Sequence, residues 1–245
     1  MKLIITMSGH SKRFTDIGLP HKLFVDVSGK PAIERFLSVY DNIDDKDKFV
    51  IKQRDMSLGP YCDNMNVVNI DPNTDGPVFS ILDADLDIDN EEEVIVTYSD
   101  FFMNFNAHIF LYQCMLCNAD GAIVTHSGFH PHRLYNSSFC YLKTKGSKVL
   151  EVKEKSHFTN DPMNEPASSG IYYFRSFGKM KKYFTELIDL NIRVNNEFYV
   201  TMPYNLMIRD ELNVIHVPVE NYMCLGAPAD VHLVNYSQKH WRFDD

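Results

Sequence analysis

The chain has 245 residues, of which 44% are hydrophobic and 23% charged, and these values exclude disordered and fibrous proteins. Apolar runs such as residues 3–7 are far shorter than the roughly 20 residues that a membrane-spanning helix needs. The N-terminus also lacks the pattern of a signal peptide, so we expect a cytoplasmic protein.

The net charge of −9 argues against a nucleic acid or an anionic membrane as the main partner. Residues 1–22 differ, because they contain four basic residues against one acidic residue. The five cysteines are odd in number and scattered, which favours reduced thiols over a disulfide framework.

The first half of the chain alternates β-branched runs with amphipathic segments, as in a sheet covered by helices. Strands are expected at residues 2–7, 48–52, 67–70, 94–98 and 122–126. Helices are expected at residues 32–40 and 78–86, each after a proline, and from an Asn106 cap to Cys117.

From about residue 135 the pattern changes to longer β-like stretches. Strands are expected at residues 138–144, 149–155, 168–174 and 213–217, with a hairpin at 145–147. Helices are expected at residues 178–190, 198–209 and 228–236. No linker divides the chain, so we expect a single domain over residues 1–245.

A phosphate-binding loop is predicted where the first strand ends. Ser8, Gly9 and Ser11 form a turn whose backbone N–H groups can approach phosphate oxygens, and Lys12 and Arg13 supply positive charge. Taken alone, the loop also fits a surface turn with two solvated cations. It is neither a dinucleotide fingerprint, since it lacks the second and third glycines, nor a P-loop, since no Gly-Lys-Ser/Thr closes it.

This segment resembles the opening of the sugar-phosphate nucleotidyltransferase family, where a Gly-rich loop ends in Arg and a Pro-x-Lys follows. The matching residues are Gly9, Arg13, Pro20 and Lys22. Further matches follow in order at Gly29-Lys30-Pro31, Asp75-Gly76, Ser99-Asp100, Glu154-Lys155, residues 168–174 and residues 225–230. Longer blocks at 100–105, 128–132, 154–174 and 196–200 resemble a branch associated with capsular polysaccharide clusters.

The resemblance implies a Rossmann-like α/β fold of the GT-A type, with a mixed, mostly parallel sheet and a β-rich acceptor side. Residues 1–134 would bind the nucleotide and residues 135–245 the acceptor, with the active site at the C-terminal strand ends. The implied reaction moves a nucleoside monophosphate, most simply CMP from CTP, onto a small phosphorylated acceptor such as phosphoglutamine or a sugar phosphate. Pyrophosphate leaves, and the implied partners include neither nucleic acid nor membrane.

The resemblance also assigns roles to individual residues. Arg13, Lys22 and Asp100 are the expected catalytic residues, and Asp100 is the expected ligand of a Mg²⁺ cofactor. The expected nucleotide-binding residues are Ser8, Gly9, His10, Ser11, Lys12, Asp75, Gly76 and Ser99. The expected acceptor-binding residues are Glu154, Lys155, Ser168, Ser169 and Glu197, with Glu165 as a further hydrogen-bonding group.

Two positions depart from the family pattern. Cys224 stands where many members carry a second metal-binding aspartate, so Asp100 would act with the phosphates alone or with Glu220 or Asp230. His10 stands where the family has a small or basic residue.

Alternative functions are a glycosyltransferase of similar fold and a non-catalytic nucleotide-binding protein. Three other patterns are interpreted as structural: the alternating Asp83, Asp85, Asp87 and Asp89 as a solvated acidic face, Cys114 and Cys117 as buried small residues, and His126, His130 and His132 as a loop cluster.

Overall fold

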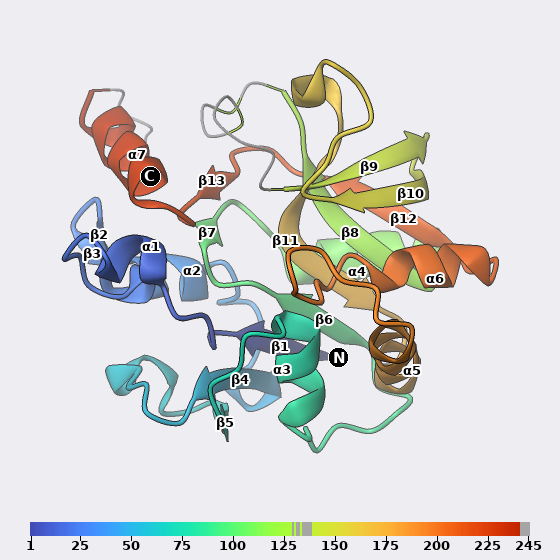
Figure 1. Ribbon diagram of the computed structural model, residues 1–245, viewed down its shortest axis with the longest axis horizontal. Coiled ribbons are helices and arrows are strands. Elements are labelled where there is room, and N and C mark those ends of the chain that lie inside the picture. The colour runs from blue at the N-terminus through green and yellow to red at the C-terminus, as the bar shows by residue number, and fades with distance from the viewer. Residues whose placement is uncertain (129, 131–132, 134–138, 241–245) are drawn as a thin grey trace.

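The computed structural model describes residues 1–128, 130, 133 and 139–240. Its main feature is a nine-stranded sheet in the order β5-β4-β1-β6-β11-β8-β12-β10-β9 (Figure 1). The strands are β1 (Lys2–Thr6), β4 (Lys48–Gln53), β5 (Asn66–Ile70), β6 (Val94–Thr97), β8 (Gly121–His126), β9 (Cys140–Lys145), β10 (Lys148–Glu154), β11 (Ala167–Phe174) and β12 (Val214–Pro218). Two small antiparallel sheets pair β2 (Asp26–Val27) with β3 (Lys30–Pro31) and β7 (Phe101–Phe102) with β13 (Met223–Cys224).

The sheet changes character along its width. Strands β5, β4, β1 and β6 pair in parallel, whereas β11 is antiparallel to both of its neighbours β6 and β8, and β10 is antiparallel to β12 and β9. The expected mixed sheet is therefore confirmed. The sheet is not mostly parallel, however: β8 and β12 pair in parallel again, so four of the eight neighbouring pairs in the strand order are parallel and four are antiparallel.

Helices cover both faces of the sheet. They are α1 (Lys12–Thr15), α2 (Ala32–Ser38), α3 (Pro77–Asp83), α4 (Ala107–Leu116), α5 (Phe177–Asp189), α6 (Pro203–Arg209) and α7 (Pro228–His240). Side chains alternate along the strands, so Ile4 packs in the cluster with α3, α5 and α6 while Leu3 and Ile5 pack in the cluster with α2 and α4.

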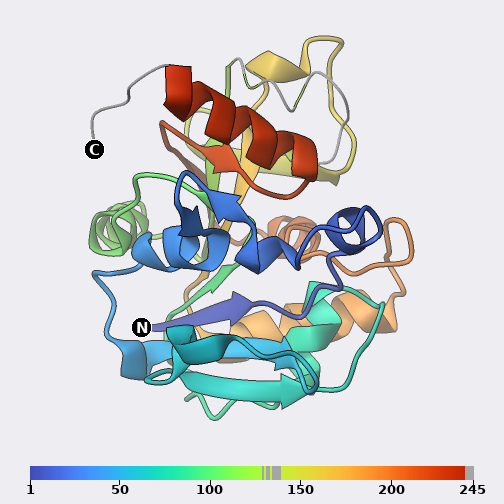
Figure 2. The ribbon, with the colours of Figure 1, turned by 90° about the vertical axis from the view of Figure 1, so that its left-hand side faces the viewer.

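A third, smaller cluster fixes the start of the chain against its end. Phe14 of α1 is 1% exposed and packs with Val27 of β2, Leu225 and Val231 of α7. Figure 2 shows α7, in red, lying beside the blue segment that contains α1 and the β2–β3 pair. Burial of Phe14 therefore anchors the basic loop before it while leaving Lys12 and Arg13 exposed.

Most predicted elements are confirmed to within a few residues. Asn106 caps α4 as expected, because its Oδ1 accepts hydrogen bonds from the N–H groups of His108 and Ile109 at 3.0 and 3.1 Å. The β9–β10 hairpin turns at Gly146 with φ 59°. The strand predicted at 138–144 begins among residues that lie partly outside the described part of the chain.

One helix boundary is wrong. The sequence predicts a helix from residue 198, but α6 begins at Pro203. The Phe198 N–H donates to the Asp75 carbonyl at 2.8 Å, and the Phe198 carbonyl accepts from the Val78 N–H at 3.1 Å. These bonds hold residue 198 extended against the loop before α3, so the helix starts only at the proline.

Two of the structural interpretations can be checked. The four alternating aspartates at 83–89 are all exposed, between buried Ala84, Leu86 and Ile88, which confirms a solvated face. Cys114 is buried as expected, but Cys117 is exposed because it follows the last turn of α4. All five cysteines are free thiols.

Candidate functional site

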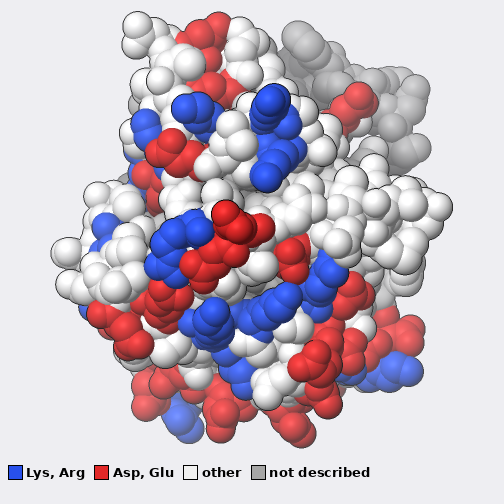
Figure 3. Space-filling view, turned by 90° about the vertical axis from the view of Figure 1, so that its right-hand side faces the viewer, with Lys and Arg blue, Asp and Glu red and all other residues white. Residues whose placement is uncertain are grey.

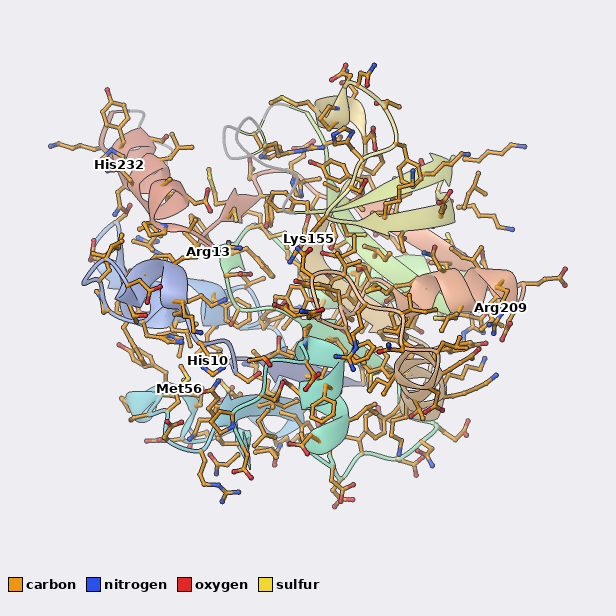
Figure 4. The ribbon with its side chains drawn as sticks, viewed as in Figure 1. His10, Arg13, Met56, Lys155, Arg209 and His232 are labelled. Atoms are coloured by element: carbon orange, nitrogen blue, oxygen red, sulfur yellow. The ribbon has the colours of Figure 1, made fainter. Side chains whose placement is uncertain are left out.

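A cavity of about 660 Å³ lies at the C-terminal ends of β1 and β6. It gathers most of the site residues predicted from the sequence, from segments far apart in the chain. Those that line it are Ser8, Gly9, His10, Ser11, Lys12, Arg13, Lys22, Gly76, Ser99, Asp100, Glu154, Lys155, Ser168 and Glu197. In Figure 4, Arg13 on the α1 side and Lys155 on the β10 side lie on opposite sides of this region.

The basic loop is held by its own backbone. Ser11 adopts the left-handed conformation (φ 53°), its carbonyl accepts from the Phe14 N–H at 2.8 Å, and its Oγ accepts from the Lys22 N–H at 3.2 Å. His21 Nε2 lies 3.0 Å from the Gly9 carbonyl oxygen. A Cβ at Gly9 would meet no protein atom within 4 Å, so an anion can approach this backbone closely.

His10 joins this loop to the loop before α3. Gln53 at the end of β4 donates through Nε2 to the Ser8 carbonyl at 2.6 Å, and the same nitrogen lies 3.2 Å from His10 Nδ1. His10 Nε2 lies 3.3 Å from the Asn73 carbonyl oxygen. His10, which departs from the family pattern, therefore links the two loops, a structural role that sequence spacing did not indicate.

At one end of the cavity, two basic side chains, Lys22 and Arg13, lie near two carboxylates, Asp100 and Asp230. Lys22 Nζ is 3.2 Å from Asp100 Oδ2, and Arg13 Nη1 donates to the Gly226 carbonyl at 3.4 Å. A Cβ added to Gly226 would lie 3.4 Å from Asp100 Oδ2, so the β13–α7 turn approaches Asp100 closely. Asp230 in the first turn of α7 also lines the cavity, whereas Glu220 does not.

Cys224 interacts with Asp230 rather than with a cation. Its Sγ lies 3.4 Å from Asp230 Oδ2, and burial, together with the negative charges of Asp230 and Asp100, raises the thiol pKa well above its ordinary value. Burial also raises the pKa of Asp230, and the charge of Asp100 adds to this effect. A protonated thiol that donates to a carboxylate is a poor metal ligand.

The carboxylates fit Mg²⁺, which prefers oxygen ligands and completes its shell with phosphate oxygens and water. Asp100 and Asp230 are the two carboxylates of the cavity at this end. Among the described residues, no group of three or more His, Cys, Asp or Glu side chains is arranged to hold a metal ion. The geometry therefore suits a cation that arrives with its phosphates.

The loop before α3 requires a glycine. Gly76 has φ 95°, and an added Cβ would lie 2.8 Å from the Phe198 backbone nitrogen. Asp75 does not line the cavity, which corrects its assignment as a nucleotide-binding side chain: it accepts a hydrogen bond from Arg193 Nη1 at 2.9 Å instead. Ser99 lines the cavity, but its Oγ donates to the Thr6 carbonyl at 3.0 Å.

The opposite end of the cavity is built from side chains that bind one another. Glu154 Oε2 accepts a hydrogen bond from Thr201 Oγ1 at 2.6 Å, and burial raises the Glu154 pKa to about 7. Lys155 Nζ hydrogen-bonds the Tyr199 hydroxyl and lies 4.3 Å from the centroid of its ring. Glu197 completes this group of cavity-lining residues.

Two predicted acceptor residues do not line the cavity. Ser169 is fully buried, with its Oγ 3.0 Å from His126 Nδ1. Glu165 accepts hydrogen bonds from the N–H groups of Phe158 and Thr159 at 2.8 and 2.6 Å, so it shapes its own loop. Both assignments are corrected. His126 itself stacks on Tyr222 with ring centroids 4.1 Å apart, and His132 lies outside the described residues.

Several lining residues were not predicted as part of the site. They include aromatic and amide side chains: Asn73, Tyr98, Phe139, Tyr172, Tyr199 and Tyr222. Tyr98 was signalled by its place directly before Ser99-Asp100 at a strand end, and Tyr199 by its place in the block at 196–200, but Tyr222 carries no comparable sequence signal. Aromatic faces beside polar groups are common in cavities that bind small molecules.

Comparisons with solved structures identify the fold. A nucleoside-diphosphate-sugar pyrophosphorylase from Vibrio cholerae superposes with a TM-score of 0.77 at 17% identity, over 96% of this chain and 99% of that one. A candidate glucose-1-phosphate thymidylyltransferase from Bacillus anthracis, in complex with sucrose, gives 0.74 at 16% identity over 100% and 98%. HddC from Yersinia pseudotuberculosis, complexed with GMP-PN, gives 0.65 at 16% identity over 96% and 98%.

These likenesses extend over nearly the whole chain and show a mixed α/β fold shared with solved nucleotidyltransferase structures. By sequence, no protein-family description and no curated protein matches the chain. Among the described residues, no helix has the length and apolar character needed to cross a membrane.

Proposed function

We propose that this chain is a nucleotidyltransferase that transfers a nucleoside monophosphate from a triphosphate to a small phosphorylated acceptor and releases pyrophosphate. One observation carries the proposal: a single cavity holds the basic loop with Lys22 and Asp100 at one end and Glu154 and Lys155 at the other. The names of the two solved structures, a nucleoside-diphosphate-sugar pyrophosphorylase and a candidate glucose-1-phosphate thymidylyltransferase, agree with this chemistry.

The charges suit an in-line displacement at the α-phosphorus. A phosphate monoester has its second pKa near 6, so the acceptor is mostly dianionic at neutral pH and needs no strong base. Catalysis then depends on positioning and on neutralising charge. Lys12 and Arg13 would hold the departing β- and γ-phosphates, and Lys22 would leave its pairing with Asp100 to reach the α-phosphate.

Mg²⁺ bound by Asp100 and Asp230 would supply further positive charge to the phosphates. Other residues of the chain would bind the phosphates, the base and the acceptor. The N–H groups near Gly9 would bind phosphate oxygens, and the loop held by Gly76 and Phe198 would form one wall of the base site. At the far end Lys155 would pair with the acceptor phosphate, and Glu154, Ser168 and Glu197 would hydrogen-bond the rest of the acceptor.

We further propose CTP as the donor, phosphoglutamine or a related phosphate as the acceptor, and a role in capsular polysaccharide synthesis in the cytoplasm. These finer assignments, with the Rossmann-like GT-A type of the fold, are supported by the sequence blocks at 100–105, 154–174 and 196–200. The free thiols agree with a reducing compartment.

The first experiment is thermal stabilisation by CTP, UTP, dTTP, ATP and GTP, each with and without Mg²⁺. A ligand at 100 times its Kd adds about 2.7 kcal/mol of stability, so the true donor should stand out from the others. That nucleotide is then tested for pyrophosphate release with a panel of phosphorylated acceptors. Stabilisation by a nucleotide-sugar but by no triphosphate would refute the proposal in favour of a glycosyltransferase.

A further inference from the structure

Helix α4 has an apolar face that points away from the sheet. Its inner side chains, Phe110 and Cys114, are buried in the cluster shared with α2. On the outer side Ile109 is 60% exposed, Tyr112 56% and Leu116 64%, with Met115 64% exposed beside them. Contiguous apolar patches of this kind on a soluble protein mark an interaction surface.

The same helix carries no charge. None of the ten residues Ala107–Leu116 is Asp, Glu, Lys or Arg, although the chain as a whole has a net charge of −9. In Figure 3 the side of the molecule on which α4 lies, at the right, is white over a broad area, while charged residues crowd the lower surface. Two copies of this acidic protein can therefore meet at α4 without repulsion between like charges.

The apolar stripe can also face a second copy of itself. Ile109, Tyr112 and Leu116 have the spacing i, i+3, i+7 that forms the seam between two packed helices. If two α4 helices pack antiparallel, Ile109 of one copy lies opposite Leu116 of the other, and the two Tyr112 rings meet near the centre. A twofold contact needs such a self-complementary patch.

From these observations we infer that the protein is a homodimer whose two copies pack α4 against α4, antiparallel, about a twofold axis near Tyr112 and Gln113. No residue of α4 lines the cavity described above. The inference therefore does not depend on the proposed function, and breaking the dimer should leave the cavity unchanged.

The first test is the molar mass in solution, from size-exclusion chromatography with light scattering at tens of micromolar protein. The wild type should have twice the 28.4 kDa of one chain, and Ile109→Glu/Leu116→Glu should have the mass of one chain. The two substitutions add four carboxylates to the contact, each opposite another, and should raise the dimer Kd by about 100-fold or more. Triphosphate-induced thermal stabilisation should stay as in the wild type, which shows that the variant is folded.

Leu190→Glu is the matched control, because Leu190 is 52% exposed at the end of α5, on the other face of the sheet. It should remain dimeric. A monomeric wild type, or a dimer that Leu190→Glu dissociates while Ile109→Glu/Leu116→Glu does not, would overturn the inference.

A cross-link tests the antiparallel arrangement. Gln113→Cys is introduced in a Cys117→Ser background, which removes the exposed thiol at the end of α4. Mild oxidation should convert this variant to a disulfide-linked dimer, and the Cys117→Ser protein alone should stay unlinked. Failure of Gln113→Cys to cross-link in a protein that is dimeric would refute the twofold axis at the centre of α4.

Discussion

The two ends of the cavity are built in different ways. At the end proposed to bind the nucleotide, backbone turns fix the loop: Ser11 is in the left-handed conformation and Gly76 packs against Phe198, while Lys12 and Arg13 stay exposed. At the end proposed to bind the acceptor, the polar side chains are hydrogen-bonded to one another. Thr201 donates to Glu154, and Lys155 donates to the Tyr199 hydroxyl. We conclude that the backbone of the first end is formed before any ligand binds and that only Lys22 must leave its partner Asp100 there. At the second end both Glu154 and Lys155 must exchange internal hydrogen bonds for bonds to the ligand.

The largest effect is expected at the nucleotide end, from Lys22→Ala. Lys22 pairs only with Asp100 among the described residues, so its loss leaves the fold intact but removes a cation from the reacting phosphates. We expect kcat for pyrophosphate release to fall by about 10²–10³-fold. Lys30→Ala is the matched control, since Lys30 forms an exposed ion pair with Glu34 and does not line the cavity. Turnover near the wild-type rate in Lys22→Ala would remove Lys22 from the mechanism.

A smaller effect is expected from a change at Asp230, the second carboxylate near the basic loop, and it should appear in the Mg²⁺ requirement. Asp230→Asn should raise the Mg²⁺ concentration for half-maximal turnover about tenfold, because it removes one of two oxygen ligands. It should also reduce the part of the triphosphate-induced thermal shift that requires Mg²⁺. Cys224→Ser keeps a donor to Asp230 and should change both readouts little.

Glu220→Gln is the control for Asp230→Asn, because Glu220 lies outside the cavity. If Glu220→Gln rather than Asp230→Asn increases the Mg²⁺ requirement, the second carboxylate has been assigned to the wrong residue.

At the acceptor end, Lys155→Met should raise KM for the phosphorylated acceptor about tenfold and leave triphosphate binding unchanged. The reason is that Lys155 lies on the far side of the cavity from Arg13 (Figure 4). Lys153→Met is a matched control two residues earlier on β10, where the ammonium lies 4.3 Å from the Phe158 ring centroid and outside the cavity. An equal loss of triphosphate binding in Lys155→Met would show that the two ends do not act separately.

The same contrast explains what the sequence could predict. The basic loop follows a strand and its residues are close in the chain, so its place at a strand end could be predicted from spacing, while the roles proposed for Arg13 and Lys22 depend on the family resemblance. Asp75 and Ser169 were misassigned because their side chains turn to Arg193 and His126, partners more than 40 residues away in sequence. Contacts of that range depend on the assembled sheet, and no local pattern encodes them.

The fold shows the same limit. Strand and helix positions follow from periodicity, which is local, but the sheet order that inserts β11 between β6 and β8 does not. The delayed start of α6 has the same origin, since residue 198 bonds to Asp75 and Val78 rather than to its neighbours.

The last expected effect concerns stability rather than turnover, and tests whether the end of the cavity that contains Glu154 holds a carboxyl group that resists ionisation. The Glu154 pKa is raised by burial from its ordinary value of 4.5 to about 7. Between these two pH values the unfolded chain loses this proton while the folded chain keeps it, so Glu154 destabilises the fold progressively as pH rises through that window. Glu154→Gln should therefore unfold at the same denaturant concentration as the wild type at pH 4.5, yet be more stable by roughly 3 kcal/mol at pH 8. Glu151→Gln, an exposed site on the same strand, should match the wild type at both pH values. If Glu154→Gln increases the free energy of unfolding equally at both pH values, the difference between the glutamine and glutamate proteins comes from packing and not from ionisation.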